Sequence, residues 1–536
     1  LLDEPWRRGR KIVMLEPRRL AARAVAMRMA YLLGEPVGRT VGFRTRLESR
    51  IGRDTRIEVV TEGILTRWLQ SDPALEGVAV VIFDEYHERS LNADLGLALC
   101  LDAQGALRED LKLLVMSATL DGAAVAKLLG EAPIVAAQGR AFDVETRWRE
   151  ARAASRTPGD RRGANDIVSD VARTICRALE DEEGDILAFL PGQGEIRRVQ
   201  RALDEGGLPQ RVGIAPLYGE LSGDDQDAAL SPARAGERKV VLATNIAETS
   251  LTIEGIRIVI DSGLARRTSF DPSTGMSRLE TVRISRASAD QRRGRAGRLE
   301  AGVCYRLWTE GEHAALPAQT PPEIVEADLA PLALELANWG VSDPQTLRWL
   351  DAPPAAAFAQ ARDLLRALDA LDRDGRVNAH GRALARIGAH PRLAHMIVHA
   401  AEIGTRRTAL EIAAVLGERD LLRTTSPQRH VDLRLRLEAL HGGALPADLQ
   451  VDAGARQRSL RSIDLLARQV DLHAVHDAPR DEADVGRLLA LAYPDRIAQS
   501  RGGGRYLLSS GRGAQLPGAQ SLAQSEFLVV ADLDAG

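Results

Sequence analysis

Short runs of apolar, β-branched residues alternate with helical patterns over residues 1–138. This alternation is typical of a parallel sheet covered by helices on both faces. Apolar residues at helical spacing predict helices over residues 20–33 and 63–69. The apolar runs predict strands at residues 12–15, 57–60, 78–83, 113–116 and 134–136.

The same pattern returns in residues 139–312 and predicts a second α/β domain. Its predicted strands are residues 144–148, 186–190, 240–243, 256–260 and 305–307. A polar stretch rich in Arg, Gly and Ser over residues 151–164 predicts a loop. Turn-forming residues flanked by short apolar alternation predict a β-hairpin over residues 264–284, with a simple surface turn as the alternative.

From about residue 321 onward, we expect the β-branched strands to disappear, and Leu and Ala recur at helical spacing. We expect a small unit over residues 313–383, a helical bundle over residues 384–475 and a further, partial domain over residues 476–536. Its run 527–530 reads as a strand without a visible partner.

Composition narrows the class of protein. The chain has 536 residues, a formal net charge of −4 and 27% charged residues of both signs, which excludes a disordered acidic or basic chain. No apolar run approaches the ~20 residues of a spanning helix. Three widely spaced cysteines offer neither a disulfide framework nor a CxxC metal site. We therefore predict a soluble, cytoplasmic protein whose nucleic-acid surface, if it has one, is a local groove.

The strongest chemical signal is the run VVIFDEYHER at residues 80–89. A buried strand that ends in Asp84 and Glu85 puts two carboxylates at the carboxyl edge of a parallel sheet, where such sheets bind ligands. There Asp84 can hold Mg²⁺, directly or through water, and Glu85 can polarise a water that attacks a γ-phosphate. Acidic residues also follow strands in loops that have no catalytic function, so this pair alone does not establish a catalytic site.

The second signal is QRRGRAGR at residues 291–298. Arg295 and Arg298 are three residues apart and point the same way on a helical turn. Guanidinium forks suit phosphate oxygens, and the neighbouring glycines allow close approach to a ligand. A solvated basic face is the alternative, which the glycines and the acidic run make less attractive.

These two runs resemble motifs II and VI of the superfamily 2 helicases of the DEAH/RHA group, with Tyr86 where the name-giving Ala stands. Five further runs resemble motifs Ia, Ib, III, IV and V in family order: EPRRLAA (16–22), TEGIL (61–65), SAT (117–119), FLPG (189–192) and TNIAETSLTI (244–253). The likeness extends over the whole chain and is greatest to the bacterial HrpB-type helicases.

The resemblance implies two tandem RecA-like parallel-sheet domains followed by winged-helix and helical-bundle domains. It implies an ATP-dependent RNA helicase that uses ATP and Mg²⁺ and couples hydrolysis to 3′–5′ movement along a single strand. The partner would be single-stranded RNA, with DNA also possible and no membrane. The hairpin at residues 264–284 resembles the family's strand-separating hairpin.

The resemblance also assigns roles to residues at matching positions. The catalytic residues would be Asp84, Glu85, His87, Gln291, Arg295 and Arg298. Nucleotide would also be contacted by Thr252 and Glu254, the latter commonly Asp in the family. The nucleic-acid backbone would be held by Arg18, Arg19, Thr61, Thr244 and Asn245. Because these contacts would go to the nucleic-acid backbone, we expect little preference for the base sequence of the bound strand.

One family element is missing from the printed sequence. The P-loop, Gly-x-x-x-x-Gly-Lys-[ST], does not occur, because none of the four lysines follows a glycine. We expect the sequence to begin after that loop and to end within its last domain, and to hydrolyse ATP very poorly as printed. An ATPase-deficient nucleic-acid-binding fragment is therefore the alternative. A metal-dependent nuclease is a weaker third, since nothing supplies a second metal site.

Overall fold

The computed structural model describes the chain except residues 47, 119–121, 138, 140–141, 151–163, 220, 222, 250–252, 272–274, 425–429, 471–481, 519 and 534–536. The chain divides into two compact units. Unit 1 consists of Leu1–Ser269, Arg278–Ala327 and Leu347–Asp351. Unit 2 consists of Phe270–Ser277, Asp328–Thr346 and Ala352–Gly536. The predicted loop at 151–164 lies almost wholly outside the described residues.

Unit 1 contains two six-stranded sheets. The first, sheet A, has the strand order β3-β2-β4-β1-β5-β6. Its strands are β1 (Lys11–Glu16), β2 (Val41–Arg44), β3 (Ser49–Arg50), β4 (Ile57–Thr61), β5 (Val78–Phe83) and β6 (Lys112–Val115). All pairs are parallel except the edge pair of β2 and β3. Its helices are α1 (Arg19–Leu32), α2 (Glu62–Ser71), α3 (Leu91–Ala106) and α4 (Gly122–Leu128), with short 3₁₀ turns η1 (Pro5–Arg7) and η2 (Tyr86–Glu88).

The strand register of sheet A aligns the ends of its central strands. Glu16 pairs with Thr61 on the neighbouring strand, and Leu15 pairs with Phe83 on the other side. Parallel strands that end level bring the residues after them to one edge of the sheet. This edge therefore collects the motifs that follow β1, β4 and β5.

Sheet B has the order β7-β14-β11-β8-β10-β9, and its strands pair in parallel. The strands are β7 (Val144–Trp148), β8 (Asp185–Phe189), β9 (Val212–Leu217), β10 (Arg238–Ala243), β11 (Ile256–Asp261) and β14 (Gly302–Arg306). Its helices are α5 (Ala164–Asp181), α6 (Gln193–Gly206), α7 (Gly223–Leu230), α8 (Arg286–Gly294) and α9 (Glu310–Ala314), with the 3₁₀ turn η3 (Asn245–Ala247). The central strands β8 and β10 are almost wholly buried, as expected when helices cover both faces.

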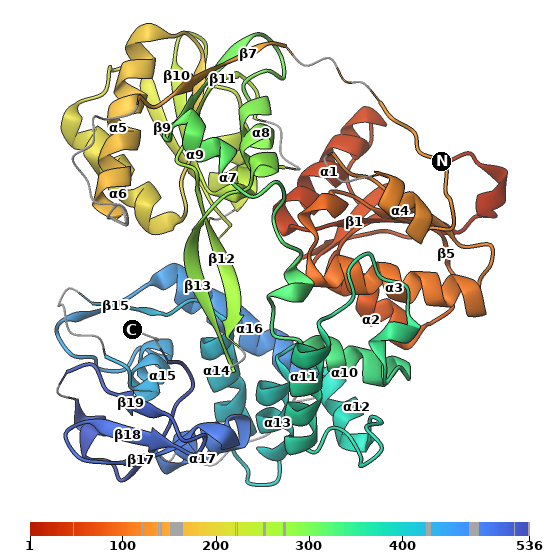
Figure 1. Cartoon of the computed structure of the whole chain (residues 1–536), viewed down its shortest axis with the longest axis vertical. Helices are drawn as coiled ribbons and strands as arrows, with labels where there is room; N and C mark the ends of the chain where they lie inside the picture. The colour runs from red at the N-terminus through yellow and green to blue at the C-terminus, as the bar shows by residue number, and fades with distance from the viewer. Residues whose placement is uncertain are drawn as a thin grey trace. The chain divides into compact units, whose positions relative to one another are not determined.

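The predicted hairpin is present. β12 (Leu264–Asp271) pairs with β13 (Met276–Arg283) in a two-stranded sheet, and the two strands run side by side in Figure 1.

Unit 2 is mainly helical but also contains strands. The helical elements in and next to this unit are η4 (Glu323–Val325, still in unit 1), α10 (Ala330–Trp339), η5 (Pro344–Thr346), α11 (Ala355–Ala367), α12 (Ala379–Arg386), α13 (Pro391–His399), α14 (Arg406–Gly417), α15 (Leu433–His441), α16 (Ala453–Gln469), α17 (Glu482–Ala492), η6 (Pro494–Arg496) and η7 (Ser521–Gln524). Its strands are β15 (Leu422–Thr424), β16 (Leu449–Val451), β17 (Ile497–Ser500), β18 (Arg505–Leu508), β19 (Gly513–Gln515) and β20 (Phe527–Val529).

Two predictions about this part were wrong. Strands do occur after residue 321, and the strand at residues 527–529 has a partner, since β20 pairs antiparallel with β17 in a four-stranded sheet. This sheet was hard to predict from the sequence because its strands are only three or four residues long and turns with glycine separate β17 from β18 and β18 from β19.

In unit 1 the predicted strand at residues 134–136 is absent. Ile134 and Val135 are apolar, but their side chains are 59% and 92% exposed and join no ladder. Conversely, β9 escaped prediction because Gly213 and Pro216 interrupt its apolar pattern. Proline is tolerated there because β9 is an edge strand.

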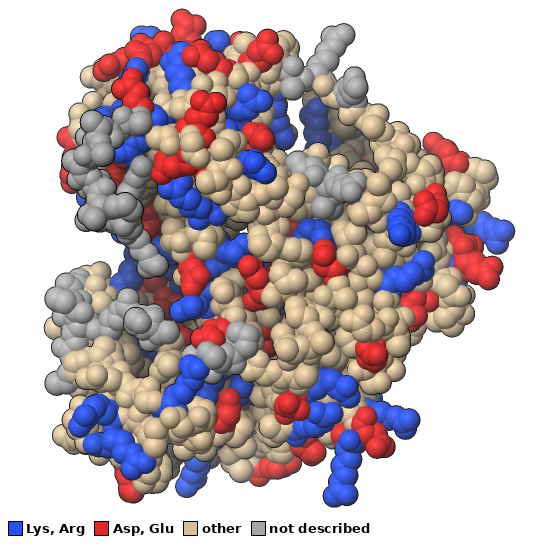
Figure 2. Space-filling view, viewed as in Figure 1, with Lys and Arg blue, Asp and Glu red and all other residues tan. Residues whose placement is uncertain are grey.

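Basic and acidic side chains are interspersed over the visible face in Figure 2, in keeping with the small net charge. Within the described ranges, none of the helices combines the length and apolar character that crossing a lipid bilayer requires.

Candidate functional site

The acidic pair lies in a sharp turn at the carboxyl end of β5. The Asp84 backbone N–H donates to the Leu15 carbonyl at 3.1 Å, which ties this turn to β1. The Asp84 carboxylate in turn accepts the Glu85 N–H at 2.8 Å. Glu85 has a φ of +49°, a left-handed conformation that is uncommon outside glycine. The turn therefore holds both carboxylates at the sheet edge, half-buried.

A third carboxyl group lies beside this pair, at the end of β1. Glu16 is fully buried, and no donor among the described residues reaches either of its oxygens. Burial, and next the negative charge of Asp84, raise the pKa of Glu16 to about 9. Glu16 is thus protonated at neutral pH and can itself donate to Asp84. Sequence reasoning gave it no role, although a charged residue that ends an apolar buried strand is a usable signal.

His87 connects the acidic turn to the segment after β6. Its side chain is only 6% exposed, and its Nδ1 lies 3.5 Å from the Glu85 carboxylate. The same nitrogen accepts the backbone N–H of Ala118 at 3.3 Å. The structure therefore brings motifs II and III together through one imidazole. Thr119, the last residue of motif III, lies outside the described residues.

The arginine run occupies α8 and the turns after it, in the part of unit 1 built on sheet B. Arg292 is fully buried: its Nε donates to Glu248 at 2.9 Å and its Nη1 donates to Asp261 at 2.8 Å. The guanidinium also lies 4.8 Å from the centroid of the Phe189 ring. This arginine therefore anchors α8 to the sheet, a role the sequence did not indicate.

Arg295 and Arg298 follow the helix. Arg295 is buried and donates from Nε to the Glu248 backbone carbonyl at 2.8 Å. Burial and the charge of Arg298 lower the pKa of Arg295 to about 9, while the Glu85 carboxylate opposes that shift. Burial also lowers the pKa of Arg298, again opposed by Glu85. The Glu85 carboxylate, which follows β5 of sheet A, thus acts electrostatically on both guanidinium groups that follow α8.

Gln291, the other predicted residue of this run, lies half-buried on α8. One glycine of the run serves the fold. A Cβ added to Gly297 would lie 2.5 Å from the Phe142 carbonyl oxygen. Because glycine has no Cβ, the backbone at Gly297 can lie close to the backbone at Phe142.

Two polar contacts link the sheet A part of unit 1 to the sheet B part. The Thr249 hydroxyl donates to Glu88, whose other oxygen accepts from Arg18 at 3.1 Å. Arg23 on α1 lies 2.5 Å from the carboxylate of Asp227 on α7. The first of these contacts involves the same turn that carries Glu85.

The residues expected to hold nucleic acid follow the carboxyl ends of strands. Arg18 and Arg19 come after β1, and Thr61 ends β4, so all three lie at one edge of sheet A. Thr244 and Asn245 come directly after β10 of sheet B. Arg19 is exposed, the other four are half-buried, and Arg18 is held by Glu88.

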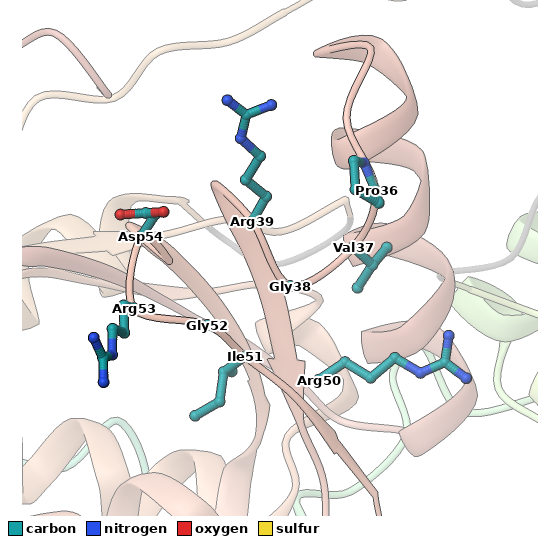
Figure 3. Close-up of a pocket in the computed structure, with 9 residues that line it drawn as sticks. All are labelled: Pro36, Val37, Gly38, Arg39, Arg50, Ile51, Gly52, Arg53 and Asp54. Atoms are coloured by element: carbon teal, nitrogen blue, oxygen red, sulfur yellow. The ribbon is translucent and has the colours of Figure 1, made fainter.

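Of the two further nucleotide candidates, Thr252 lies outside the described residues. Glu254 is exposed in the turn just before β11. A separate hollow of about 500 Å³ lies beside β2 and β3, where Arg39, Arg50 and Arg53 are among its lining residues (Figure 3). It includes none of the predicted site residues.

Comparison with known proteins adds an independent view. Residues 170–300 match the family described as "Helicase conserved C-terminal domain". The chain is 46% identical to the "ATP-dependent RNA helicase HrpB" of Escherichia coli (strain K12), over 99% of this chain and 61% of that protein. It is 35% identical to the "Probable ATP-dependent RNA helicase DHR2" of Saccharomyces cerevisiae, over 82% of this chain and 59% of that protein.

A solved structure agrees with these relatives. The crystal structure of the Escherichia coli DEAH/RHA helicase HrpB matches with a TM-score of 0.82 at 45% identity, over 98% of this chain and 62% of that one. The chain thus spans about three fifths of the length of the curated relatives named here. By sequence and by fold, it belongs to the DEAH/RHA helicases of the HrpB type.

Proposed function

We propose that this chain forms the nucleotide-hydrolysing and RNA-binding core of an ATP-dependent RNA helicase. The observation that carries the proposal is the hydrogen bond from the Thr249 hydroxyl to Glu88, which joins the turn that carries Glu85 to the sheet B part of unit 1, where Glu85 acts electrostatically on Arg295 and Arg298. Phosphoryl transfer needs a carboxylate that polarises the attacking water. It also needs guanidinium groups that neutralise the charge developing on the phosphate. The names of the relatives support the same activity.

The donor set at the sheet edge fits Mg²⁺. Asp84 and Glu85 present carboxylate oxygens at this edge, the hard ligands that Mg²⁺ prefers, whereas Glu16 beside them keeps its proton because burial raises its pKa. In the proposal Asp84 holds the ion, which would neutralise charge on the triphosphate of ATP. Glu85 accepts a proton from the attacking water, while His87 and Gln291 position these groups.

For the nucleic acid we propose single-stranded RNA. Arg18, Arg19, Thr61, Thr244 and Asn245 would contact its backbone, and Thr252 and Glu254 would contact nucleotide. Movement in the 3′–5′ direction, strand separation by the β12–β13 hairpin and a cytoplasmic location are parts of the proposal that rest on family resemblance. We also propose, from the same resemblance, that residues after 312 divide into a winged helix (313–383), a helical bundle (384–475) and a further domain from residue 476.

Nucleic-acid binding without hydrolysis is the second candidate, because the printed sequence contains no Gly-x-x-x-x-Gly-Lys-[ST]. The two candidates predict different results in one experiment. RNA-stimulated ATP hydrolysis and RNA binding are measured for the full-length product of the gene and for this chain.

If the helicase proposal is correct, Glu85→Gln lowers the ATPase rate of the gene product by ~100-fold or more and leaves RNA binding intact. The matched control is Glu237→Gln, an exposed carboxylate in the loop before β10, which leaves both unchanged. An unaltered ATPase rate in Glu85→Gln would refute the proposed site. Absence of ATPase from the gene product, with RNA binding retained, would favour the binding module.

A further inference from the structure

Three histidines meet on one side of the helical part of unit 2. The nitrogen ligand atoms of His380, His395 and His399 all lie within 4.8 Å of one another. His380 Nε2 lies 2.8 Å from His395 Nδ1. The ring centroids are 5.0 Å apart for His380 and His399 and 4.4 Å apart for His395 and His399. Within the described residues, this is the one group of three or more His, Cys, Asp or Glu side chains close enough to share a metal ion.

Two packed helices hold the three rings. His395 and His399 are four residues apart on α13 and therefore share one face of that helix. His380 comes from the first turn of α12, which packs beside α13 (Figure 1). The Asn378 side chain caps α12 by accepting the Gly381 N–H at 2.8 Å, so the position of that turn is well defined. The spacing of the α13 pair is the same i, i+4 spacing that lets two helical histidines bind one zinc ion.

The surroundings suit neutral imidazoles. All three rings are half-buried, and the His399 side chain is 33% exposed, which leaves a route from solvent. Burial, followed by the charges of neighbouring histidines, lowers the pKa of His395 to about 4 and also lowers the pKa of His380. Two carboxylates face the cluster: Asp369 acts on His380 and His395, and Glu402 lies 3.4 Å from His399 Nδ1.

We propose that His380, His395 and His399 bind one Zn²⁺ ion that joins α12 to α13. Three imidazoles suit zinc, copper and nickel far better than magnesium or calcium, which prefer oxygen ligands. A tetrahedral zinc with Zn–N bonds of about 2.0–2.1 Å needs its nitrogens roughly 3.3 Å apart. The His380–His395 pair would therefore separate by roughly half an ångström, while His399 moves inward. Water or the Glu402 carboxylate would take the fourth position.

The proposal does not depend on the helicase function, since it concerns residues of unit 2 that take no part in the nucleotide site. Its alternative is a packed histidine cluster held by the His380–His395 hydrogen bond alone. The two differ in whether the cluster binds metal, and that is measurable in the chain.

The test is calorimetric titration of ZnCl₂ into the chelator-treated chain. A Cys176→Ser background removes the exposed thiol, whereas Cys100 and Cys304 are buried. We expect one zinc ion per chain. His380→Gln and His399→Gln should each weaken binding by ~100-fold or more, since even second-layer changes around zinc cost 10–100-fold. His441→Gln is the matched control, because that half-exposed histidine of α15 lies beside Glu411 and outside the cluster, and it should bind zinc as the parent does.

Cobalt supplies a second measurement. Co²⁺ in the same site should give the intense visible absorption of a tetrahedral complex, absent in His399→Gln. Thermal unfolding of each metal-free variant shows whether it is folded, and added zinc should raise the melting temperature of the parent and of His441→Gln only. Failure of the parent to bind zinc, or equal binding by the parent and both cluster variants, would overturn the proposal.

Discussion

The Thr249 hydroxyl donates a hydrogen bond to the Glu88 carboxylate, and so joins the segment after β10 to the turn after β5. The second Glu88 oxygen is held by Arg18 at 3.1 Å. One carboxylate therefore connects motif V of one sheet with motifs II and Ia of the other. Because the same turn carries Glu85, this contact fixes the approach of the acidic turn to the arginines after α8.

Arg18 and Arg19 are expected to differ in their effect on stability. Each substitution by alanine should weaken RNA binding and reduce the slope of log K against log salt by about 0.7 for each phosphate that is no longer neutralised. Only Arg18→Ala should also lower the free energy of unfolding, by about 0.5–1 kcal/mol, because it breaks the half-buried pair with Glu88. Salt-dependent RNA titration and urea unfolding measure the two effects. Arg53→Ala, an exposed arginine away from these motifs, should alter neither.

Arg298→Ala should lower the RNA-stimulated ATPase rate of the full-length gene product by ~10³-fold, the effect typical of an arginine that neutralises transferring phosphate. RNA binding and the unfolding midpoint should stay near those of the parent, because the buried ion pairs that anchor this run belong to Arg292 and not to Arg298. Arg286→Ala, an exposed arginine at the start of α8, is the control. A rate for Arg298→Ala equal to that of the control would remove this residue from the proposed site.

Arg292→Ala should be among the most destabilising changes in the motif. The substitution leaves Glu248 and the fully buried Asp261 without their shared cation. Removing one partner of a buried ion pair typically costs about 3–5 kcal/mol. Urea unfolding compares this variant with Arg286→Ala, for which we expect a change within about 0.5 kcal/mol. A small cost for Arg292→Ala would mean that the anchor is dispensable.

Glu16 should make stability depend on pH. Its pKa is about 9 in the folded chain and 4.5 in the unfolded chain, so only the folded state keeps the proton between these values. The contribution of Glu16 to the free energy of unfolding is fully present below pH 4.5. It is lost as the pH rises toward 9, by at most about 1.4 kcal/mol per pH unit.

The substitution Glu16→Gln keeps the shape of the side chain but removes its titratable carboxyl group. Urea unfolding at pH 6, 7 and 8 should give a flatter pH profile for Glu16→Gln than for the parent, and greater stability at pH 8. The isosteric change Glu237→Gln at the surface should preserve the parent's profile. Parallel profiles for parent and Glu16→Gln would mean that Glu16 is ionised in the folded chain.

The predictability of individual strands depended on whether their residues form an uninterrupted run in the sequence. β5 was predicted residue for residue because a central parallel strand, buried on both faces, is an uninterrupted apolar run. The missed strands β3 and β9 carry no such run, since β3 has two exposed residues and β9 contains glycine and proline. The edge strand β7, in contrast, has the predicted bounds. Residues 134–136 show the converse error, since their apolar side chains face solvent and no neighbouring strand pairs with them.

The sequence by itself determined the α/β class, the order of the motifs and the acidic pair after a buried strand, because these depend on residues close together in the chain. Only the tertiary structure decided which arginine of the run anchors α8 and which faces Glu85. It also placed Glu16 in a buried position beside Asp84, which raises the pKa of Glu16. The His395–His399 spacing is visible in the sequence, but His380 joins them only because α12 packs on α13. Helical and strand periodicity describes neighbours within about four residues, whereas packing between elements sets the charges, distances and burial on which chemistry depends.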